Sequence, residues 1–314
     1  MATGDMNLSK LAKQFSDETS ARAFMEELRW GKNAKNAACP RCGGADPYRL
    51  TAKPGSKSPV RPGVWKCRAC RKQFTVTVGT VFESSHIPLS KWLLAIHLLA
   101  SSKKGISAHQ LHRNLGITYE AAWFMAHRLR YAMNMGPLAD LLDGIVEVDE
   151  TYVGGRRRGK QGRPGGDSHK TPVVALVERK SGRVRAMPMP RVTEKNLRET
   201  ISQHVKPSAR LMTDELSSYV PVGGTLASHE SVRHSDREYV RGDVHTNTVE
   251  GFFSLLKRGV HGVYHHVGRG HLGRYCDEFA FRYENRHASD GDRAALVVSG
   301  ADGKRLTYKQ PAAS

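Results

Sequence analysis

The sequence has no apolar run of about 18 residues, the length that a membrane-spanning helix requires. The N-terminal segment, MATGDMNLSKLAKQF, also lacks the apolar stretch of a secretory signal. We therefore expect no membrane partner. We expect a cytoplasmic protein, associated with the nucleoid.

Acidic residues are scarce relative to basic ones. The 314 residues include 49 Lys and Arg against 30 Asp and Glu, a formal net charge of +19. Such an excess repels itself in a compact fold and attracts the phosphate backbone of nucleic acids. The charge predicts a nucleic-acid partner, but a ribosome-associated or generally adhesive basic protein would show the same balance.

Cysteine is scarce as well, and four of the five cysteines form two CxxC pairs separated by 24 residues. The pairs are Cys39 with Cys42 and Cys67 with Cys70. Without a secretory signal, this pattern favours metal binding over disulfides. Four thiolates suit tetrahedral zinc and leave it no open position, so we expect a structural Zn²⁺ in a zinc ribbon over 36–82.

Residues 83–138 have the pattern of helices. Ser107 fits a helix cap, Gly116 permits a turn, and the helix that follows carries Arg128 and Arg130. This pattern is typical of a helix-turn-helix, whose second helix enters the major groove, although many helical hairpins share it. Beside a basic zinc ribbon, it predicts that Arg128 and Arg130 bind DNA.

The segment 144–155, GIVEVDETYVGG, combines strong strand preference with three carboxylates, Glu147, Asp149 and Glu150. Burying an unpaired carboxylate costs roughly several kcal/mol, so the strand indicates a cation site. Alternation places Glu147 and Asp149 on one face and Glu150 on the other, and alone does not choose among them. Our working hypothesis is that Asp149 is the first metal ligand.

A basic, glycine-rich segment follows this strand, and it shows no hydrophobic period. It begins with Arg156, Arg157 and Arg158. Such composition predicts a mobile loop. Its place beside the carboxylates makes substrate DNA a reasonable partner, and a solvated insertion is the alternative.

Two further acids complete the pattern. A short strand over 209–213 delivers Asp214 to its carboxyl end, where ligands gather in α/β sheets, although a helix-capping role is also open. The helix in HTNTVEGFFSLLKRGV places Glu250 and Lys257 together beside its apolar stripe. Spaced carboxylates suit Mg²⁺ or Mn²⁺, and two such ions about 4 Å apart promote phosphodiester cleavage.

Five motifs, in this order, resemble those of bacterial insertion-sequence transposases. They are CPRCGG, WKCRACRKQF, VEVDETYVGG, LMTDELSSY and HTNTVEGFFSLLKRGVHGVYHHV. The resemblance is to the zinc-ribbon branch of the DDE superfamily, which has a ribonuclease H-like catalytic core, and it covers 8–287. It implies binding to transposon ends, metal-dependent hydrolysis that frees a 3′-hydroxyl, and attack of that hydroxyl on target DNA. It also implies a homo-oligomer assembled on paired terminal inverted repeats.

By this resemblance, Asp149 and Asp214 are the first two metal-binding acids. The third position in this branch is glutamate or asparagine, and the sequence offers both Glu250 and Asn247. We choose Glu250, because a charged oxygen better offsets the metal and because Lys257 follows seven residues later. Such a lysine would contact DNA near the scissile phosphate. Asn247 remains the alternative.

The expected fold class is α/β, a ribonuclease H-like mixed sheet with flanking helices. The expected division is a helical lead, the zinc ribbon, a helix-turn-helix-like region, the catalytic domain and a poorly ordered tail, over 1–35, 36–82, 83–138, 139–290 and 291–314. Two other functions fit the same residues. One is a ribonuclease H-like nuclease without strand transfer, and the other is a non-catalytic DNA-binding regulator.

Overall fold

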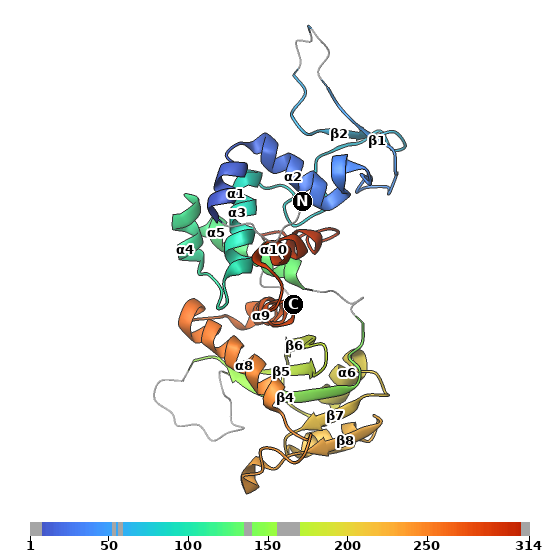
Figure 1. The fold of residues 1–314 in the computed structure, drawn as a ribbon, viewed down its shortest axis with the longest axis vertical. Coiled ribbons are helices and arrows are strands. Elements are labelled where there is room, and N and C mark those ends of the chain that lie inside the picture. The colour runs from blue at the N-terminus through green and yellow to red at the C-terminus, as the bar shows by residue number, and fades with distance from the viewer. Residues whose placement is uncertain (1–7, 52–54, 56–58, 135–139, 156–169, 309–314) are drawn as a thin grey trace. The chain divides into compact units, whose positions relative to one another are not determined.

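The computed structural model describes residues 8–51, 55, 59–134, 140–155 and 170–308 (Figure 1). The contacts divide the chain into two compact units. The first is Met1–Met133 with Ala288–Pro311, and the second is Asn134–His287 with Ala312–Ser314. Among the described residues, no helix has the length and apolar character needed to cross a membrane.

The first unit is mainly helical. Its helices are α1 Leu8–Gln14, α2 Glu18–Trp30, α3 Leu89–Ser101, α4 Ala108–Leu115, α5 Tyr119–Met133 and α10 Asp290–Ser299. Helix α3 is apolar around most of its circumference, as expected of a helix enclosed by its neighbours. Trp92 and Leu99 of this helix are almost completely buried. Helix α3 is therefore the core of the unit.

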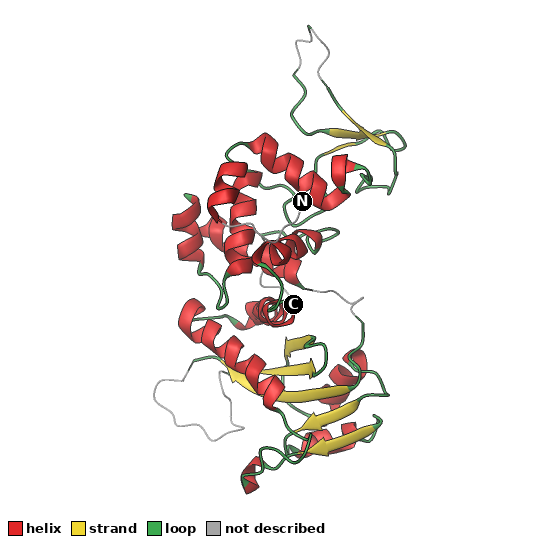
Figure 2. Cartoon of the chain, viewed as in Figure 1, coloured by secondary structure: helices red, strands yellow, loops and turns green. Residues whose placement is uncertain are grey.

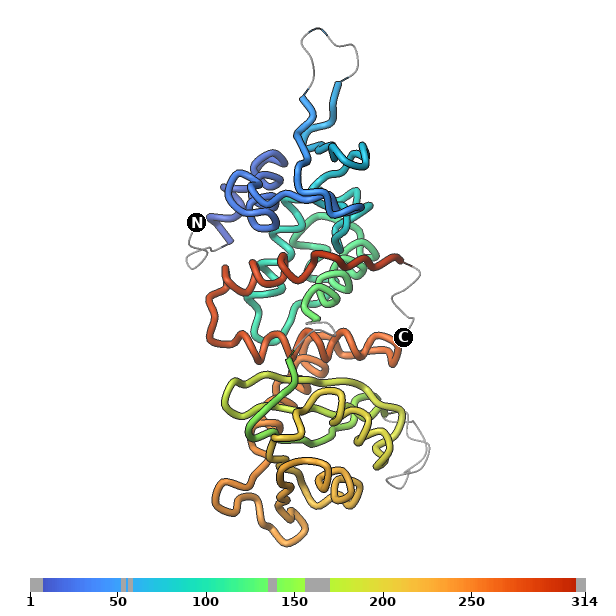
Figure 3. Tube along the Cα trace, turned by 90° about the vertical axis from the view of Figure 1, so that its right-hand side faces the viewer, coloured from blue at the N-terminus to red at the C-terminus, as the bar shows by residue number. Residues whose placement is uncertain are grey.

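The prediction of a poorly ordered tail over 291–314 is wrong for its first part, because Asp290–Ser299 forms α10. Ser289 caps this helix by accepting a hydrogen bond from the Asp292 N–H at 3.1 Å. Val297 and Val298 are buried, and α10 packs against α2, α3 and α5 (Figure 3). The apolar stripe of α10 is short, so the helix is stabilised mainly by packing against its neighbours in the fold.

The ribbon is a small antiparallel sheet in the order β1-β2-β3, with β1 Pro47–Arg49, β2 Trp65–Cys67 and β3 Gln73–Phe74. Trp65 and Phe74 contact the ring of Trp30 of α2, at 5.5 and 6.1 Å between centroids. Glu26 of α2 accepts a hydrogen bond from Trp65 Nε1 at 3.1 Å. The ribbon is therefore built on α2 rather than separate from the helices before it.

The second unit contains a five-stranded sheet in the order β6-β5-β4-β7-β8. Its strands are β4 Ile145–Val153, β5 Thr171–Glu178, β6 Val184–Pro188, β7 Arg210–Thr213 and β8 Ser228–Ser231. Strands β6, β5 and β4 are antiparallel, whereas β4, β7 and β8 are parallel. The predicted mixed sheet with flanking helices is confirmed.

Helices cover both faces of this sheet (Figure 2). Helices α8 Asn247–Gly259 and α9 Leu272–Glu284 pack on one face, and α6 Glu194–His204 and α7 Val220–Gly223 pack on the other. Both faces of strand β5 are covered, and its sequence is apolar between Thr171 and Glu178, as expected of such a strand. Cys276 of α9 points into this core, where burial raises the pKa of its thiol. Short helical turns complete the structure: η1 Lys32–Ala34, η2 Ser217–Tyr219, η3 His234–Asp236, η4 Val260–Tyr264 and η5 Arg269–His271.

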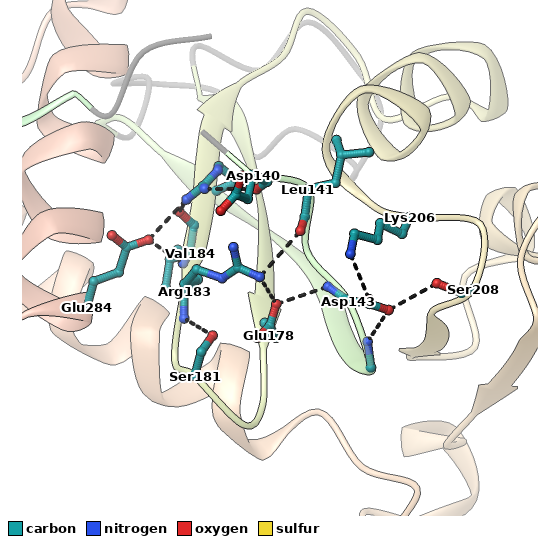
Figure 4. A network of polar contacts seen from close by, with 12 residues as sticks. Asp140, Leu141, Asp143, Glu178, Ser181, Arg183, Val184, Lys206, Ser208 and Glu284 are labelled. Atoms are coloured by element: carbon teal, nitrogen blue, oxygen red, sulfur yellow. Dashed lines mark hydrogen bonds and ion pairs between the residues drawn. The ribbon is translucent and has the colours of Figure 1, made fainter. Parts of the chain in front are cut away.

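A polar network fixes the entry to β4 (Figure 4). Asp143 accepts hydrogen bonds from Lys206 Nζ at 3.0 Å and Ser208 Oγ at 3.1 Å. The backbone N–H of Asp143 donates to Glu178 Oε2 at 2.9 Å, and Glu178 is also paired with Arg183. The start of the strand is thereby held to β5 and to the loop before β7.

Candidate active site and zinc site

The four predicted cysteine ligands come together in the ribbon. The Sγ atoms of Cys39 and Cys70 are 3.7 Å apart, and those of Cys42 and Cys67 are 3.6 Å apart. All four sulfur atoms lie within 4.8 Å of one another. Thiolates about 2.3 Å from a tetrahedral zinc ion are separated by roughly 3.8 Å. The four cysteines therefore fit a structural zinc ion.

Both CxxC turns have the same backbone form. The residue after each second cysteine is left-handed, with φ of 73° at Gly43 and 61° at Arg71. A Cβ atom on Gly44 would lie 3.2 Å from Cys67 Sγ, so glycine permits the two turns to approach. The backbone N–H of Cys70 donates to Cys67 Sγ at 3.5 Å and lowers the pKa of that thiol, which favours the thiolate.

In the second unit, strand register brings two predicted acids together. Glu147 of β4 pairs with Met212 of the parallel strand β7. Asp149 and Asp214 each follow two residues later, so they leave the same face of the sheet at adjacent positions. Asp214 also accepts a hydrogen bond from the Leu216 N–H at 3.0 Å, which stabilises the turn after β7. Asp214 therefore stabilises this turn and also lies beside Asp149.

Glu150 joins these two acids, although the sequence assigned it no role. Carboxylate oxygens of Asp149, Glu150 and Asp214 lie within 4.8 Å of one another. Strand β7 pairs with β4 only as far as Glu147, so the acids lie where the pairing of these two strands has ended. Sequence alternation missed this arrangement because it assumes a continuous neighbouring strand. The only signal available was the adjacency of Glu150 to Asp149.

The acid cluster is electrostatically unfavourable without a cation. Burial, and after it the charges of Glu150, Asp214 and Glu250, together raise the pKa of Asp149 to about 7. Burial is also the main cause that raises the pKa of Glu150 and the pKa of Asp214. A divalent ion would offset this repulsion, and carboxylate oxygens are the ligands that Mg²⁺ prefers. The residues present therefore fit such an ion.

Both candidates for the third ligand lie in the first turn of α8. Glu250 accepts a hydrogen bond from Thr246 Oγ1 at 3.0 Å, and its carboxylate lies 3.9 Å from His234 Nε2. Its charge reaches Asp149, but it is outside the group of oxygens within 4.8 Å. Asn247 is exposed, and so is Lys257, which lies two turns beyond Glu250 on the same helix. The structure brings the first two acids together and leaves the third at the rim.

The predicted DNA contacts Arg128 and Arg130 are wrong, because this fold buries both side chains. They are 7% and 2% exposed, and the Arg128 guanidinium lies over the ring of Phe124 at 4.5 Å. From Met125 to Arg130, every residue of α5 is buried, so this stretch is a core helix rather than a groove-reading surface.

The helical hairpin itself has the expected form. The Ser107 hydroxyl caps α4 by accepting from the Gln110 N–H at 3.2 Å, and Gly116 ends α4 in a left-handed conformation with φ of 57°. The start of α5 is exposed at Tyr119, whose ring stacks on His109 at 4.3 Å. The predicted contacts Arg156, Arg157 and Arg158 lie outside the described residues.

A mixed sheet that carries half-buried acids in the middle of β4 and just after β7, preceded by a four-cysteine ribbon, is the architecture of a ribonuclease H-like transposase. Comparison with known families agrees. Residues 141–284 match the ISXO2-like transposase domain, and residues 16–73 match the transposase zinc-ribbon domain. The chain is also 30% identical, over 292 residues, to a protein of the transposable element ISH50 of Halobacterium salinarum. That alignment covers 87% of this chain and 92% of its relative.

The chain therefore belongs to the family of insertion-sequence transposases that combine these two domains. The resemblance inferred from the five sequence motifs is confirmed. The ribbon match begins at residue 16 and so includes α2, in keeping with the packing of the ribbon on that helix. Membership of this family implies a DNA-binding protein with a structural zinc ion in its ribbon.

Proposed function

We propose that this transposase binds the terminal inverted repeats of its insertion sequence and catalyses metal-dependent hydrolysis followed by strand transfer. The convergence of Asp149, in the middle of β4, with Asp214, directly after the adjacent strand β7, carries the proposal. Both are carboxylates whose pKa is raised by burial, so the site favours a bound cation over three unpaired charges.

Asp149 and Asp214 would hold Mg²⁺ or Mn²⁺, with Glu250 as the third ligand and Asn247 as the alternative. Divalent ions at such a site activate the attacking oxygen and stabilise the leaving oxygen of a phosphodiester. Glu150 adds charge on the β4 side of the cluster, where the Tyr219 hydroxyl orients it by a hydrogen bond of 2.8 Å. The protein thus supplies half-buried acids on adjacent strands and a further acid, Glu250, at the rim of the site.

DNA would reach this site along the exposed side of α8. Lys257 projects from that helix into solvent, where its ammonium can pair with a phosphate next to the scissile bond. The ribbon offers a second cationic surface, with exposed basic residues Arg41, Arg68, Arg71 and Lys72. With a net charge of +19, both surfaces suit binding that is dominated by phosphate contacts. Assembly as a homo-oligomer would bring two transposon ends together.

The proposal is tested by incubating the purified protein with terminal-repeat DNA, a target plasmid and Mg²⁺. Joined products are expected from the wild type and none from Asp149→Ala or Asp214→Ala. A Glu199→Ala variant is the control for nonspecific loss, because it removes an exposed acid from α6 and keeps the cluster. Cleavage without joining would identify a nuclease instead, and binding without either product would identify a regulator.

A further inference from the structure

Helix α8 begins without a cap from its own N-cap residue. The first N–H groups of a helix need acceptors, and a threonine at the N-cap ordinarily supplies one through its hydroxyl. Thr246 occupies that position but makes no such hydrogen bond. Its Oγ1 donates instead to Glu250 Oε1 at 3.0 Å. The first turn of α8 must therefore be satisfied from elsewhere.

Glu147 of β4 supplies the missing acceptor across the fold. Its Oε2 accepts from the backbone N–H groups of Thr248 at 2.7 Å and Val249 at 3.0 Å. Its Oε1 accepts from the Thr248 hydroxyl at 2.7 Å. The N–H groups are those an N-cap side chain would bind, and the carboxylate also complements the positive end of the helix dipole.

The buried charge of Glu147 is paired as well. The residue is 0% exposed, and Arg179 Nε donates to Glu147 Oε1 at 2.8 Å. The same guanidinium donates to the backbone oxygens of Asp243 at 2.8 Å and His245 at 3.2 Å. Arg179 thus ties Glu147 to the segment that leads into α8. A buried carboxylate with this many partners is a rigid attachment point.

We infer that Glu147 is a positioning residue for the active site: it joins the strand of Asp149 to the helix of Glu250 and leaves Thr246 free to orient Glu250. Glu147 precedes Asp149 by two residues on the same face of β4, so one strand carries both a candidate ligand and the anchor of another. The inference rests on the proposed function, because it takes Glu250 as the third ligand.

The test compares Glu147→Gln with Glu178→Gln in the full-length protein. Glu178 is a matched control, since it is also a buried sheet carboxylate that accepts a backbone N–H and pairs with an arginine, but these partners are Asp143 and Arg183 and not residues of α8. Two quantities are measured. One is the rate of amide hydrogen exchange over 247–251 without added Mg²⁺ or Mn²⁺, and the other is the dissociation constant for Mn²⁺.

For Glu147→Gln we expect exchange in the first turn of α8 to quicken about tenfold and Mn²⁺ to bind about 10–100-fold more weakly, the usual effect of losing an outer partner of a metal site. Glu178→Gln should change neither by more than about threefold, even where both variants lose similar thermal stability. Equal effects of the two substitutions on exchange or on Mn²⁺ affinity would overturn the inference.

A second variant, Thr246→Val, removes the hydrogen bond to Glu250 while keeping the shape of a buried side chain that is 1% exposed. It should weaken Mn²⁺ binding without changing exchange in α8, and unchanged Mn²⁺ affinity would overturn the orienting role of Thr246. A wild type that binds no Mn²⁺ contradicts the proposed function. The exchange comparison still decides whether Glu147 anchors α8, because it needs neither metal nor DNA.

Discussion

The hydroxyl of Tyr219, a residue with no exposed surface, donates a hydrogen bond of 2.8 Å to Oε2 of Glu150 in the acid cluster. The phenol comes from the loop that follows Asp214, so the two elements that carry the cluster are joined by side chains as well as by strand pairing. This contact turns Glu150 from an acid of no assigned role into a fixed part of the site.

Substituting Tyr219→Phe tests that contact. Phenylalanine fills the same buried volume but leaves Glu150 without its donor, so we expect a loss of about 1–3 kcal/mol in the free energy of unfolding. DNA cleavage should also fall, since Glu150 is no longer held in place. Denaturant unfolding and cleavage assays measure the two effects. In a Glu150→Gln background, Tyr219→Phe should cost less, and an equal cost in both backgrounds would show that the hydrogen bond is unimportant.

Stability of the protein without Mg²⁺ should fall as pH rises. Burial raises the folded-state pKa of Asp149 to about 7, above its ordinary value of 3.8. Between these values the folded state holds the proton that the unfolded state releases. Deprotonation therefore lowers the free energy of unfolding, by up to about 4 kcal/mol once the pH exceeds about 7.

Thermal unfolding at about pH 5 and about pH 8 measures this effect. The buffer contains no Mg²⁺, and the ribbon keeps its zinc. Asp149→Asn should flatten the difference, because asparagine does not ionise. Adding Mn²⁺ should stabilise the wild type more at the higher pH, since the ligands must be deprotonated to bind. Stability that is independent of pH in the wild type, or greater pH dependence in Asp149→Asn, would contradict the assignment.

The ribbon should depend on its metal. Structural zinc contributes roughly 10 kcal/mol or more of binding free energy, which is comparable to the whole stability of an ordinary domain. Replacing Cys39 and Cys42 with serine should therefore abolish the bound zinc and open 36–82 to proteolysis. Metal analysis and limited digestion check both results. Cys276→Ser is the control, because that thiol lies in the core of the other unit. Intact zinc content in the double variant would refute the site.

Substituting the buried arginines of α5 should change stability rather than DNA recognition. Arg130→Ala removes a long side chain from the core, so we expect a loss of about 2–3 kcal/mol. Arg113→Ala, on the exposed side of α4, should leave stability unchanged, and it should reduce the salt dependence of DNA binding by about one phosphate contact if the hairpin lies on DNA. Calorimetry and binding titrations at several salt concentrations distinguish the two. A stable Arg130→Ala variant with weakened DNA binding would restore the original prediction.

The sequence predicted those parts of the protein that depend on local spacing. The CxxC pairs required a common ion, and the apolar stripe of α8 required a sheet to cover, so the ribbon and the placement of that helix followed from the residues alone. Asp149 and Asp214 could be predicted from the sequence, because Asp149 interrupts the apolar pattern of a strand and Asp214 directly follows the end of one. Local sequence patterns were sufficient to predict a feature wherever that feature depends on a single helix, strand or turn.

The remaining features depend on how elements meet. From spacing alone Glu147 is one of three equivalent acids, because its partners in α8 lie about 100 residues away in the chain. Arg128 was read as a surface residue, since nothing in its helix shows that the neighbouring helices enclose that stretch. Glu150 joins the cluster beyond the last β4–β7 pair and is held there by Tyr219, 69 residues away in the chain. Each of these outcomes is set by tertiary contacts that spacing along the chain does not encode.

The choice between Glu250 and Asn247 as third ligand is decided by substituting each. Glu250 carries the charge that acts on Asp149, and the Thr246 hydroxyl holds its carboxylate at 3.0 Å, so Glu250→Gln should reduce cleavage at least about 100-fold and weaken Mn²⁺ binding. Asn247→Ala, one turn earlier on the same helix, should reduce cleavage less than about tenfold, because its amide is a weaker ligand for a hard cation. Both residues are exposed at the helix start, so neither change should lower the melting temperature noticeably. If Asn247→Ala proves the more damaging, with Glu250→Gln still binding Mn²⁺ like the wild type, the asparagine is the ligand and Glu250 serves only to balance charge at the rim.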